Sequence, residues 1–292
     1  MQQRHALLAI HLGAFLFGLT GVLGKLAQTS PLMITCGRAL FAVLALGLFA
    51  RLIGGSGGPR PSLRQHLLLS LGGLLLGAHW LTFFHSVKIS GVAIATLGFA
   101  SFPAFTLLLE GLLFRERLHW QEFLSVGLVC LGLVLVTPHF ELASEATQGL
   151  LWGILSGLLF ALLSLLNRVS TRGLDPVQAA LWQNLTIAVC LLPFAASTLP
   201  TVQASDWLWI GLLGVFCTGL AHGLFVASLR VLKARTTSVI FALEPVYGIS
   251  IAWLLFHEQP TLRMLAGGVL IVMASVLTAR LASAGKAKPV VV

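Results

Sequence analysis

Ten apolar stretches, each close to 20 residues long, follow one another along the chain with short links between them. The predicted spans are 5–26, 32–52, 66–87, 91–113, 119–137, 149–169, 177–198, 206–229, 236–256 and 261–281. An α-helix of about 20 residues crosses the roughly 30 Å hydrocarbon core of a bilayer. With 57% hydrophobic and only 9% charged residues, the chain cannot cover such a core with polar surface. The pattern predicts an all-α integral membrane protein with ten transmembrane helices.

The Lys and Arg residues are distributed unevenly over the links between these spans. If the amino terminus lies inside, fourteen basic residues are cytoplasmic and three are outside, namely Lys25, Lys88 and Arg263. Cytoplasmic loops carry the excess of basic residues in multi-pass proteins. We therefore predict a multi-pass protein of the cell (inner) membrane with both termini cytoplasmic. The net charge of +9 then reflects orientation, and a nucleic-acid partner is not expected.

One segment occurs twice, as SFPAFTLLLEGLLFRER at 101–117 and as LEPVYGISIAWLLFHEQ at 243–259. Both copies place a proline, the run Leu-Leu-Phe and a glutamate at the same spacing. The pairs related by 142 residues, or 143 for the last, are Pro103 and Pro245, Glu116 and Glu258, Gly72 and Gly214, Gly77 and Gly219, Ser86 and Ser228, and Lys25 and Arg168. The repeat unit is five spans long, which divides the chain into residues 1–140 and 141–292.

A unit of five spans has a direct consequence for topology. Because five is odd, the second copy enters the membrane from the opposite side, which makes an inverted-topology repeat. Such repeats allow two similar conformations that face opposite sides, and alternating access uses them in this way. The fold predicted is two inverted five-helix repeats around a central cavity.

The two repeat segments resemble a known family. LLFRERLHWQEFLSVGLVCLGLVLV (112–136) and LEPVYGISIAWLLFHEQPTLRMLAGGVLIVMASVL (243–277) look like the two EamA-type repeats of the drug/metabolite transporter superfamily, and CGRALFA (36–42) is also similar. The resemblance covers nearly the whole chain and implies a ten-helix exporter of small metabolites, commonly amino acids or their derivatives. Phe17 departs from the Trp that many relatives carry there, and substrate identity is not carried over.

Two charged residues inside the spans are candidate substrate-binding or coupling groups. Polar side chains in hydrocarbon are costly unless they pair or line water. Glu244, next to Pro245, could bind substrate or a coupling proton, and Arg38 could bind a carboxylate bidentately. The alternative is that the two side chains pair with each other and stabilise the bundle.

Further candidates for a substrate site are polar or aromatic residues within spans, and each has a structural alternative. His79 could face a cavity or be a buried, hydrogen-bonded histidine, and Gln183 could link two helices. The other candidates are Trp80, Phe83, His222 and Tyr247. Aromatic residues in an apolar helix are more often packing residues than ligands.

Pro103 and Pro245 are hinge candidates, although kinked helices are also common static features. Glu116 and Glu258 lie at span ends near Arg117 and Arg263. We predict that these glutamates cap helices or form ion pairs at the rim.

Motifs for other chemistries are missing from the sequence. The four cysteines lie inside apolar spans without CxxC spacing, and there is no Walker A, GxGxxG or HExxH motif. We therefore expect no cofactor, no metal site and no enzyme activity. The prediction is a secondary transporter for export of amino-acid-like metabolites, with protons as the candidate coupling ion, as a monomer or homodimer in the lipid bilayer. The alternatives are a multidrug or lipophilic-cation exporter and a non-transporting membrane enzyme.

Overall fold

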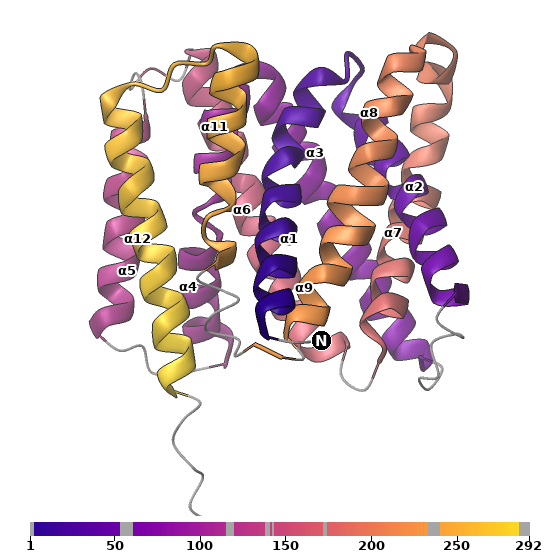
Figure 1. The fold of residues 1–292 in the computed structure, drawn as a ribbon, viewed down its shortest axis with the longest axis horizontal. Helices are drawn as coiled ribbons and strands as arrows, with labels where there is room; N and C mark the ends of the chain where they lie inside the picture. Colours follow the sequence, from indigo (N-terminus) through magenta and orange to yellow (C-terminus); the bar gives the residue numbers. More distant parts are fainter. Residues whose placement is uncertain are drawn as a thin grey trace, which may run out of the picture.

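The computed structural model describes residues 3–52, 61–114, 120–137, 141, 143–171, 174–229, 231–232 and 240–285, and this part of the chain is helical without strands (Figure 1). Six helices or helix pairs are long and apolar enough to cross a membrane. They are α1 (Gln3–Leu26), α2 (Pro31–Leu52), α3 (Leu63–Phe99), α6 (Glu145–Ser170), α7 (Pro176–Ala195) with the 3-10 turn η1 (Ala196–Thr201), and α8 (Ala204–Gly214) continued by η2 (Val215–Leu220) and α9 (Ala221–Leu229). Four further apolar helices are α4 (Phe102–Phe114), α5 (Trp120–Val136), α11 (Glu244–Phe256) and α12 (Leu262–Gly285). The prediction of an all-α membrane protein is confirmed.

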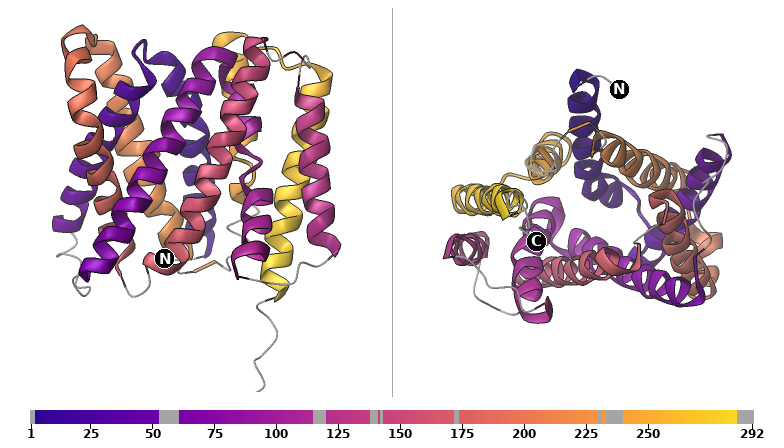
Figure 2. Two further views of the ribbon diagram at one scale, coloured as in Figure 1. Left: turned by 180° about the vertical axis from the view of Figure 1, so that it is seen from behind. Right: turned by 90° about the horizontal axis from the view of Figure 1, so that it is seen from below.

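The helices run side by side in one bundle (Figures 1 and 2), and its two ends are named here by the residues they hold. Helix α1 begins, and helix α12 finishes, at the end that we call the amino-terminal end. The opposite end holds Lys25, Gly91 and Glu258 around one pocket, and we call it the Lys25 end. Large apolar side chains such as Leu44, Leu112 and Leu254 are exposed on the surface of the bundle. A helix that is apolar on its outer face suits a lipid environment.

Side-chain caps fix where several helices begin. The Ser62 hydroxyl accepts the Gln65 N–H at 3.3 Å, and the Asp175 carboxylate accepts the Val177 N–H at 3.2 Å. The first amide groups of a helix have no partner within the helix, so these side chains satisfy them. Ser62 and Asp175 therefore mark the residues at which the links before α3 and α7 end.

Helix α3 contains the junction of the third and fourth predicted spans. Gly91 has φ 84° and ψ 173°, which interrupts the helical backbone and divides α3 into residues 63–90 and 92–99. Residues other than glycine rarely adopt this conformation. The helix thus breaks at a single glycine, directly after the short link predicted at 88–90, and residues 88–90 themselves are helical.

The predicted unbroken helices over 91–113 and 236–256 are wrong. Helix α3 ends at Phe99 and α4 begins at Phe102, and α11 begins only at Glu244 after a turn at 242–243. Each break lies just before a proline, which lacks the N–H that an unbroken helix would need there for its hydrogen bond to the preceding turn. The two breaks lie 142 residues apart and so occupy equivalent positions of the sequence repeat.

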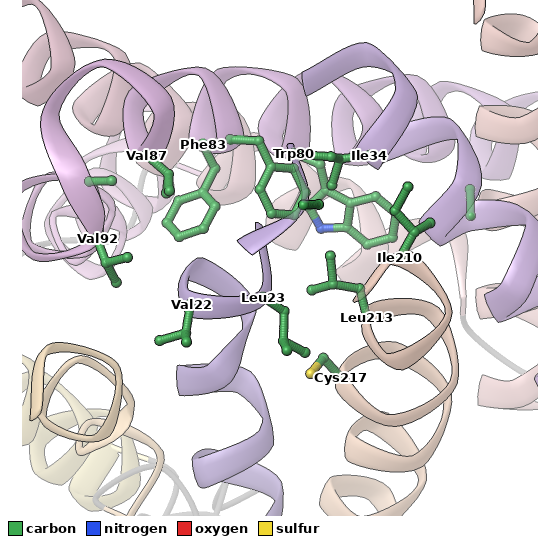
Figure 3. Packing of buried hydrophobic residues seen from close by; sticks show 14 of the residues in the cluster. Val22, Leu23, Ile34, Trp80, Phe83, Val87, Val92, Ile210, Leu213 and Cys217 are labelled. Atoms are coloured by element: carbon green, nitrogen blue, oxygen red, sulfur yellow. The ribbon is translucent and has the colours of Figure 1, made fainter. Parts of the chain in front are cut away.

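Helices from the two halves of the chain pack against one another. The most extensive packing joins α3 to both α6 and α7, α5 to α12, α2 to α7, and α1 to both α11 and α9. The largest apolar cluster lies among α1, α2, α3 and α8 and includes Val22, Trp80, Phe83 and Leu213 (Figure 3). The core is therefore shared by both halves.

Candidate functional site

Arg38 is the most deeply buried charged residue of the candidate site. Its side chain on α2 is only 2% exposed. The Nε–H donates to Thr218 Oγ1 at 2.8 Å, and Nη2 lies 3.5 Å from the Cys217 carbonyl oxygen. Nη1 is buried and has no hydrogen-bond partner. One edge of the guanidinium is thus held by the protein, and the other edge retains donors.

The partners of Arg38 come from an irregular stretch of helix. Residues Val215–Leu220 form a π-helix, and the Thr218 hydroxyl also donates to Leu213 O, five residues earlier, at 3.0 Å. Single π-turns inside α-helices occur frequently at functional sites. This wider turn presents both Thr218 Oγ1 and the Cys217 carbonyl oxygen to one guanidinium.

Aromatic rings cover the Arg38 guanidinium. The Trp80 ring centroid lies 4.0 Å from the Arg38 Cζ atom, and the Phe84 centroid lies at 5.8 Å. A cation at this distance from an indole is stabilised by the ring quadrupole, more strongly where water is excluded. Trp80 is therefore a partner of Arg38, and its 5% exposure leaves the ring inside the core.

Glu244 is the first residue of α11 and is half-buried. Its charge and that of Arg38 attract each other, but the two side chains form no ion pair; the ion pairs of the described residues are Lys25–Glu258 and Arg168–Glu110. Close passage of α1 fixes this part of α11, since a Cβ on Gly18 would lie 2.9 Å from the Glu244 carbonyl oxygen. An acidic and a basic group thus interact electrostatically without direct contact.

His79 and Phe83 belong to a buried cluster next to Trp80. His79 Nδ1 lies 2.7 Å from Ser156 Oγ, and its ring centroid is 5.0 Å from those of Phe99 and Phe160. Phe83 packs against Phe99 with its ring centroid at 5.9 Å. The geometry of His79 is that of a buried histidine hydrogen-bonded between α3 and α6, the structural alternative that the sequence left open.

The remaining candidates lie away from Arg38. Gln183 Nε2 donates to Asn167 Oδ1 at 2.7 Å and joins α7 to α6. The Tyr247 hydroxyl lies 3.2 Å from His11 Nδ1, so this ring ties α11 to α1. His222 is half-buried on α9. These contacts link helices and do not converge with Arg38 on one site.

Both proline candidates occupy the second position of a helix. Pro103 follows Phe102 at the start of α4, and Pro245 follows Glu244 at the start of α11. In the first turn of a helix, the missing N–H of proline removes no hydrogen bond, because N–H groups in this turn have no acceptor within the helix. The two prolines therefore lie in the first turns of α4 and α11, and hinge motion at the two breaks stays a prediction.

Sequence reasoning missed Thr218, Cys217 and Ser156 as partners of the candidate residues. Thr218 carried a usable signal, since it is a polar residue in the middle of an apolar span next to Gly219. Within the described part of the chain, no group of three or more His, Cys, Asp or Glu residues could hold a metal ion. The arrangement can bind an acceptor at Arg38 and a donor or proton at Glu244.

Comparison with known proteins gives consistent matches over the whole chain. The sequence model of the EamA-like transporter family matches residues 4–137 and again residues 147–280. The chain is 25% identical to the uncharacterized transporter YxxF of Bacillus subtilis, over 95% of this chain and 90% of the relative. It is 29% identical to an uncharacterized transporter of Archaeoglobus fulgidus, over 94% of this chain and 96% of that relative.

Two further similarities concern a named transporter and a solved fold. An S-adenosylmethionine uptake transporter of Rickettsia bellii is 26% identical over 70% of this chain and 69% of its own length. A solved crystal structure superposes with a TM-score of 0.66, covering 98% of this chain and 100% of that chain at 19% identity. This structural similarity concerns the fold alone.

Proposed function

Because this chain belongs to the EamA-like transporter family, we propose that it is a secondary transporter that moves small metabolites by alternating access. The proposal includes ten spans in two inverted repeats, residues 1–140 and 141–292, around a central cavity. It also includes export as the direction, the cell inner membrane as the location, and cytoplasmic termini. The family and the transporter names of its relatives speak for a transporter and against an enzyme.

The pattern of helix packing supports the inverted repeat. A two-fold axis that exchanges the halves allows two kinds of helix contact. A helix can pack against its own counterpart in the other half, or a contact between two helices can occur a second time between their two counterparts. Helix α5 packs against α12, and α2 against α7, which are the counterparts in the repeat. Helix α1 packs against α9 and α11, just as α6 packs against α3 and α4. The family match, which occurs once in each half with equal length, agrees with this division.

Two hydrogen bonds support the same symmetry at the level of side chains. Ser86 on α3 donates to the Gly149 carbonyl oxygen near the start of α6 at 2.6 Å. Ser228, its partner in the repeat, lies 3.1 Å from the Ala6 carbonyl oxygen near the start of α1, and 2.7 Å from the Leu224 carbonyl oxygen of its own helix. Both hydroxyls are fully buried. Equivalent residues thus make equivalent contacts, which is expected of two copies of one unit.

The substrate class that we propose is a small zwitterion such as an amino acid. The observation that carries it is Arg38 Nη1, a buried donor without a partner, in a guanidinium whose other edge is already hydrogen-bonded. A buried donor without an acceptor costs about 1–3 kcal/mol, more for a charged group. A carboxylate bound at that edge removes this cost, and Glu244 is available for the ammonium group or for a coupling proton.

The relative named for S-adenosylmethionine uptake suggests one compound to test first. S-adenosylmethionine carries an α-amino carboxylate group, so it belongs to the substrate class proposed for Arg38 and Glu244. The name of that relative gives uptake, and export by this chain is our proposal. Direction therefore needs a separate measurement.

Counterflow in proteoliposomes tests this function. Purified protein is screened with labelled amino acids, S-adenosylmethionine, nucleosides and quaternary cations, with and without a pH gradient. Exchange of an α-amino acid or of S-adenosylmethionine is expected, and the response to the gradient shows whether protons are coupled. Exchange of quaternary cations alone would favour a multidrug exporter. Chemical turnover of a compound in detergent would favour an enzyme.

A further inference from the structure

One carboxylate at the Lys25 end joins three segments that are far apart in the sequence. Glu258 lies in the link between α11 and α12 and forms an ion pair with Lys25, in the last turn of α1. The same carboxylate accepts the Val92 N–H at 3.1 Å and the Ala93 N–H at 3.3 Å. These amides begin the second segment of α3, where the helix dipole favours a negative charge. Glu258 is thus held by a cation and by a helix start at once.

The backbone around this carboxylate is unusual. In the described part of the chain, positive φ angles occur at Gly91 (84°) and His257 (55°), and both residues adjoin the contacts of Glu258. A Cβ on Gly91 would lie 2.9 Å from Glu258 Oε1, so only glycine leaves room for the carboxylate. Rare backbone conformations persist where the surrounding structure holds them, and they cluster at switches and clamps. The conformation of Gly91 thus makes room for this carboxylate, and His257 ends α11 as a left-handed C-cap directly before Glu258.

The ion pair lies between a pocket and an apolar layer. The pocket at the Lys25 end has a volume of about 580 Å³ and is lined by Lys25, Lys88, Glu258 and Val87, among others. Below it, Val87 packs with Val22, Phe83 and Val92, whose side chains point toward one another in Figure 3. This apolar layer separates the pocket from the deeper part of the bundle.

The candidate substrate site lies beyond that layer. Trp80, which covers Arg38, precedes Gly91 by eleven residues on α3. At 1.5 Å per residue, this places Trp80 about 16 Å below the glycine along the helix axis. A solute that enters from the Lys25 end must pass the ion pair and the apolar layer before it reaches Arg38.

We propose that Glu258, bound to Lys25 and to the Val92 and Ala93 amides, is a latch that holds the Lys25 end of the transporter closed. Opening requires the carboxylate to leave both partners, after which α1 and α11 can separate from the second segment of α3. The pocket then extends through the apolar layer to Arg38. The latch rests on the proposed alternating access, but it can be tested without a known substrate.

Cysteine labelling measures the opening directly. Val22 belongs to the apolar layer, does not line the pocket and is 1% exposed, so a Val22→Cys side chain reacts with a membrane-impermeant maleimide only when this layer opens. The labelling rate is measured in purified protein, with the chain lacking the added cysteine as background. Glu258→Gln removes the charge at nearly constant shape. We expect it to raise the rate about tenfold, the change in an equilibrium when one hydrogen bond to a charged group is lost.

Two variants separate the parts of the latch. Lys25→Met leaves Glu258 on the Val92 and Ala93 amides, so we expect a smaller rise in labelling than in Glu258→Gln. Exchanging the charges, with Lys25→Glu and Glu258→Lys together, retains an ion pair but places a cation at a helix start. The raised rate should therefore persist, and a return to the parent rate would overturn the role of the two amides.

Glu110→Gln is the matched control. It breaks the ion pair that Glu110 forms with Arg168 at 2.9 Å, at the amino-terminal end of the bundle. Labelling of Val22→Cys should not change in this variant, and an equal rise would mean general loosening and no latch. An unchanged labelling rate in folded Glu258→Gln and Lys25→Met also overturns the latch. If Glu258→Gln does not fold, the labelling rate of Lys25→Met alone decides. If the latch is overturned but the parent protein shows counterflow, the proposed transporter function still stands.

Discussion

Thr218→Val tests how Arg38 is held. The substitution keeps the shape of the side chain and removes the oxygen that accepts the Arg38 Nε–H at 2.8 Å. Hydrogen bonds to charged groups contribute about 1.5–3 kcal/mol in soluble proteins, whereas bonds between membrane helices average about 0.6 kcal/mol. Arg38 is only 2% exposed, so water cannot replace the lost acceptor. We therefore expect the free energy of unfolding to fall by about 1–2 kcal/mol, a factor of 5–30 in the folded-to-unfolded ratio.

Thr218→Ser is the matched control, since it retains the hydroxyl group. Thermal unfolding in detergent should place Thr218→Val below Thr218→Ser and below the parent protein. Counterflow should fall with Thr218→Val as well, because a guanidinium free to rotate no longer presents Nη1 in a fixed direction. Equal stability of the valine and serine variants would refute the reasoning, as it would mean that the Thr218 contact contributes nothing.

Three further predictions concern single side chains. Glu244→Gln should abolish most counterflow while the protein remains folded, and equal transport by this variant at every pH tested would exclude Glu244 as a coupling group. Gly91→Ala should lower the free energy of unfolding by at least about 1 kcal/mol, measured by thermal unfolding, because φ is 84° and the new Cβ would meet Glu258. Gln183→Leu should lower stability by about 1 kcal/mol through loss of the 2.7 Å bond to Asn167 and leave counterflow unchanged. A selective loss of counterflow in Gln183→Leu would instead return this residue to the substrate site.

The sequence predicted the rim glutamates only in part. Glu258 was expected to cap a helix or to form an ion pair near Arg263, and it does both. Its cation, however, is Lys25, 233 residues earlier, and the helix start that it caps is that of residues 92–99. Glu116 and Arg117 lie outside the described residues. Chemistry at a span end could be predicted, but the partner could not, because it depends on which helices meet in space.

The candidate site shows the same limit. Arg38, Glu244 and Trp80 stood out as polar or aromatic residues within apolar spans, and Arg38 and Trp80 do contact each other. The pairing of Arg38 with Glu244, one of the alternatives, does not occur as an ion pair. Instead, Thr218 accepts a hydrogen bond from Arg38 and lies in a π-helical turn. The irregular geometry of this turn cannot be predicted from the periodic pattern of residues.

The sequence by itself determined that this chain is helical and lies in a membrane. In hydrocarbon every backbone amide must be satisfied within its own segment, so about 20 apolar residues are sufficient to specify a crossing helix. Only the tertiary structure decided where helices break, which donors of Arg38 remain without a partner, and how Glu258 bridges α1, α3 and the link before α12. These features depend on contacts between residues far apart in the chain, and such contacts arise from packing, which the order of residues along one helix does not specify.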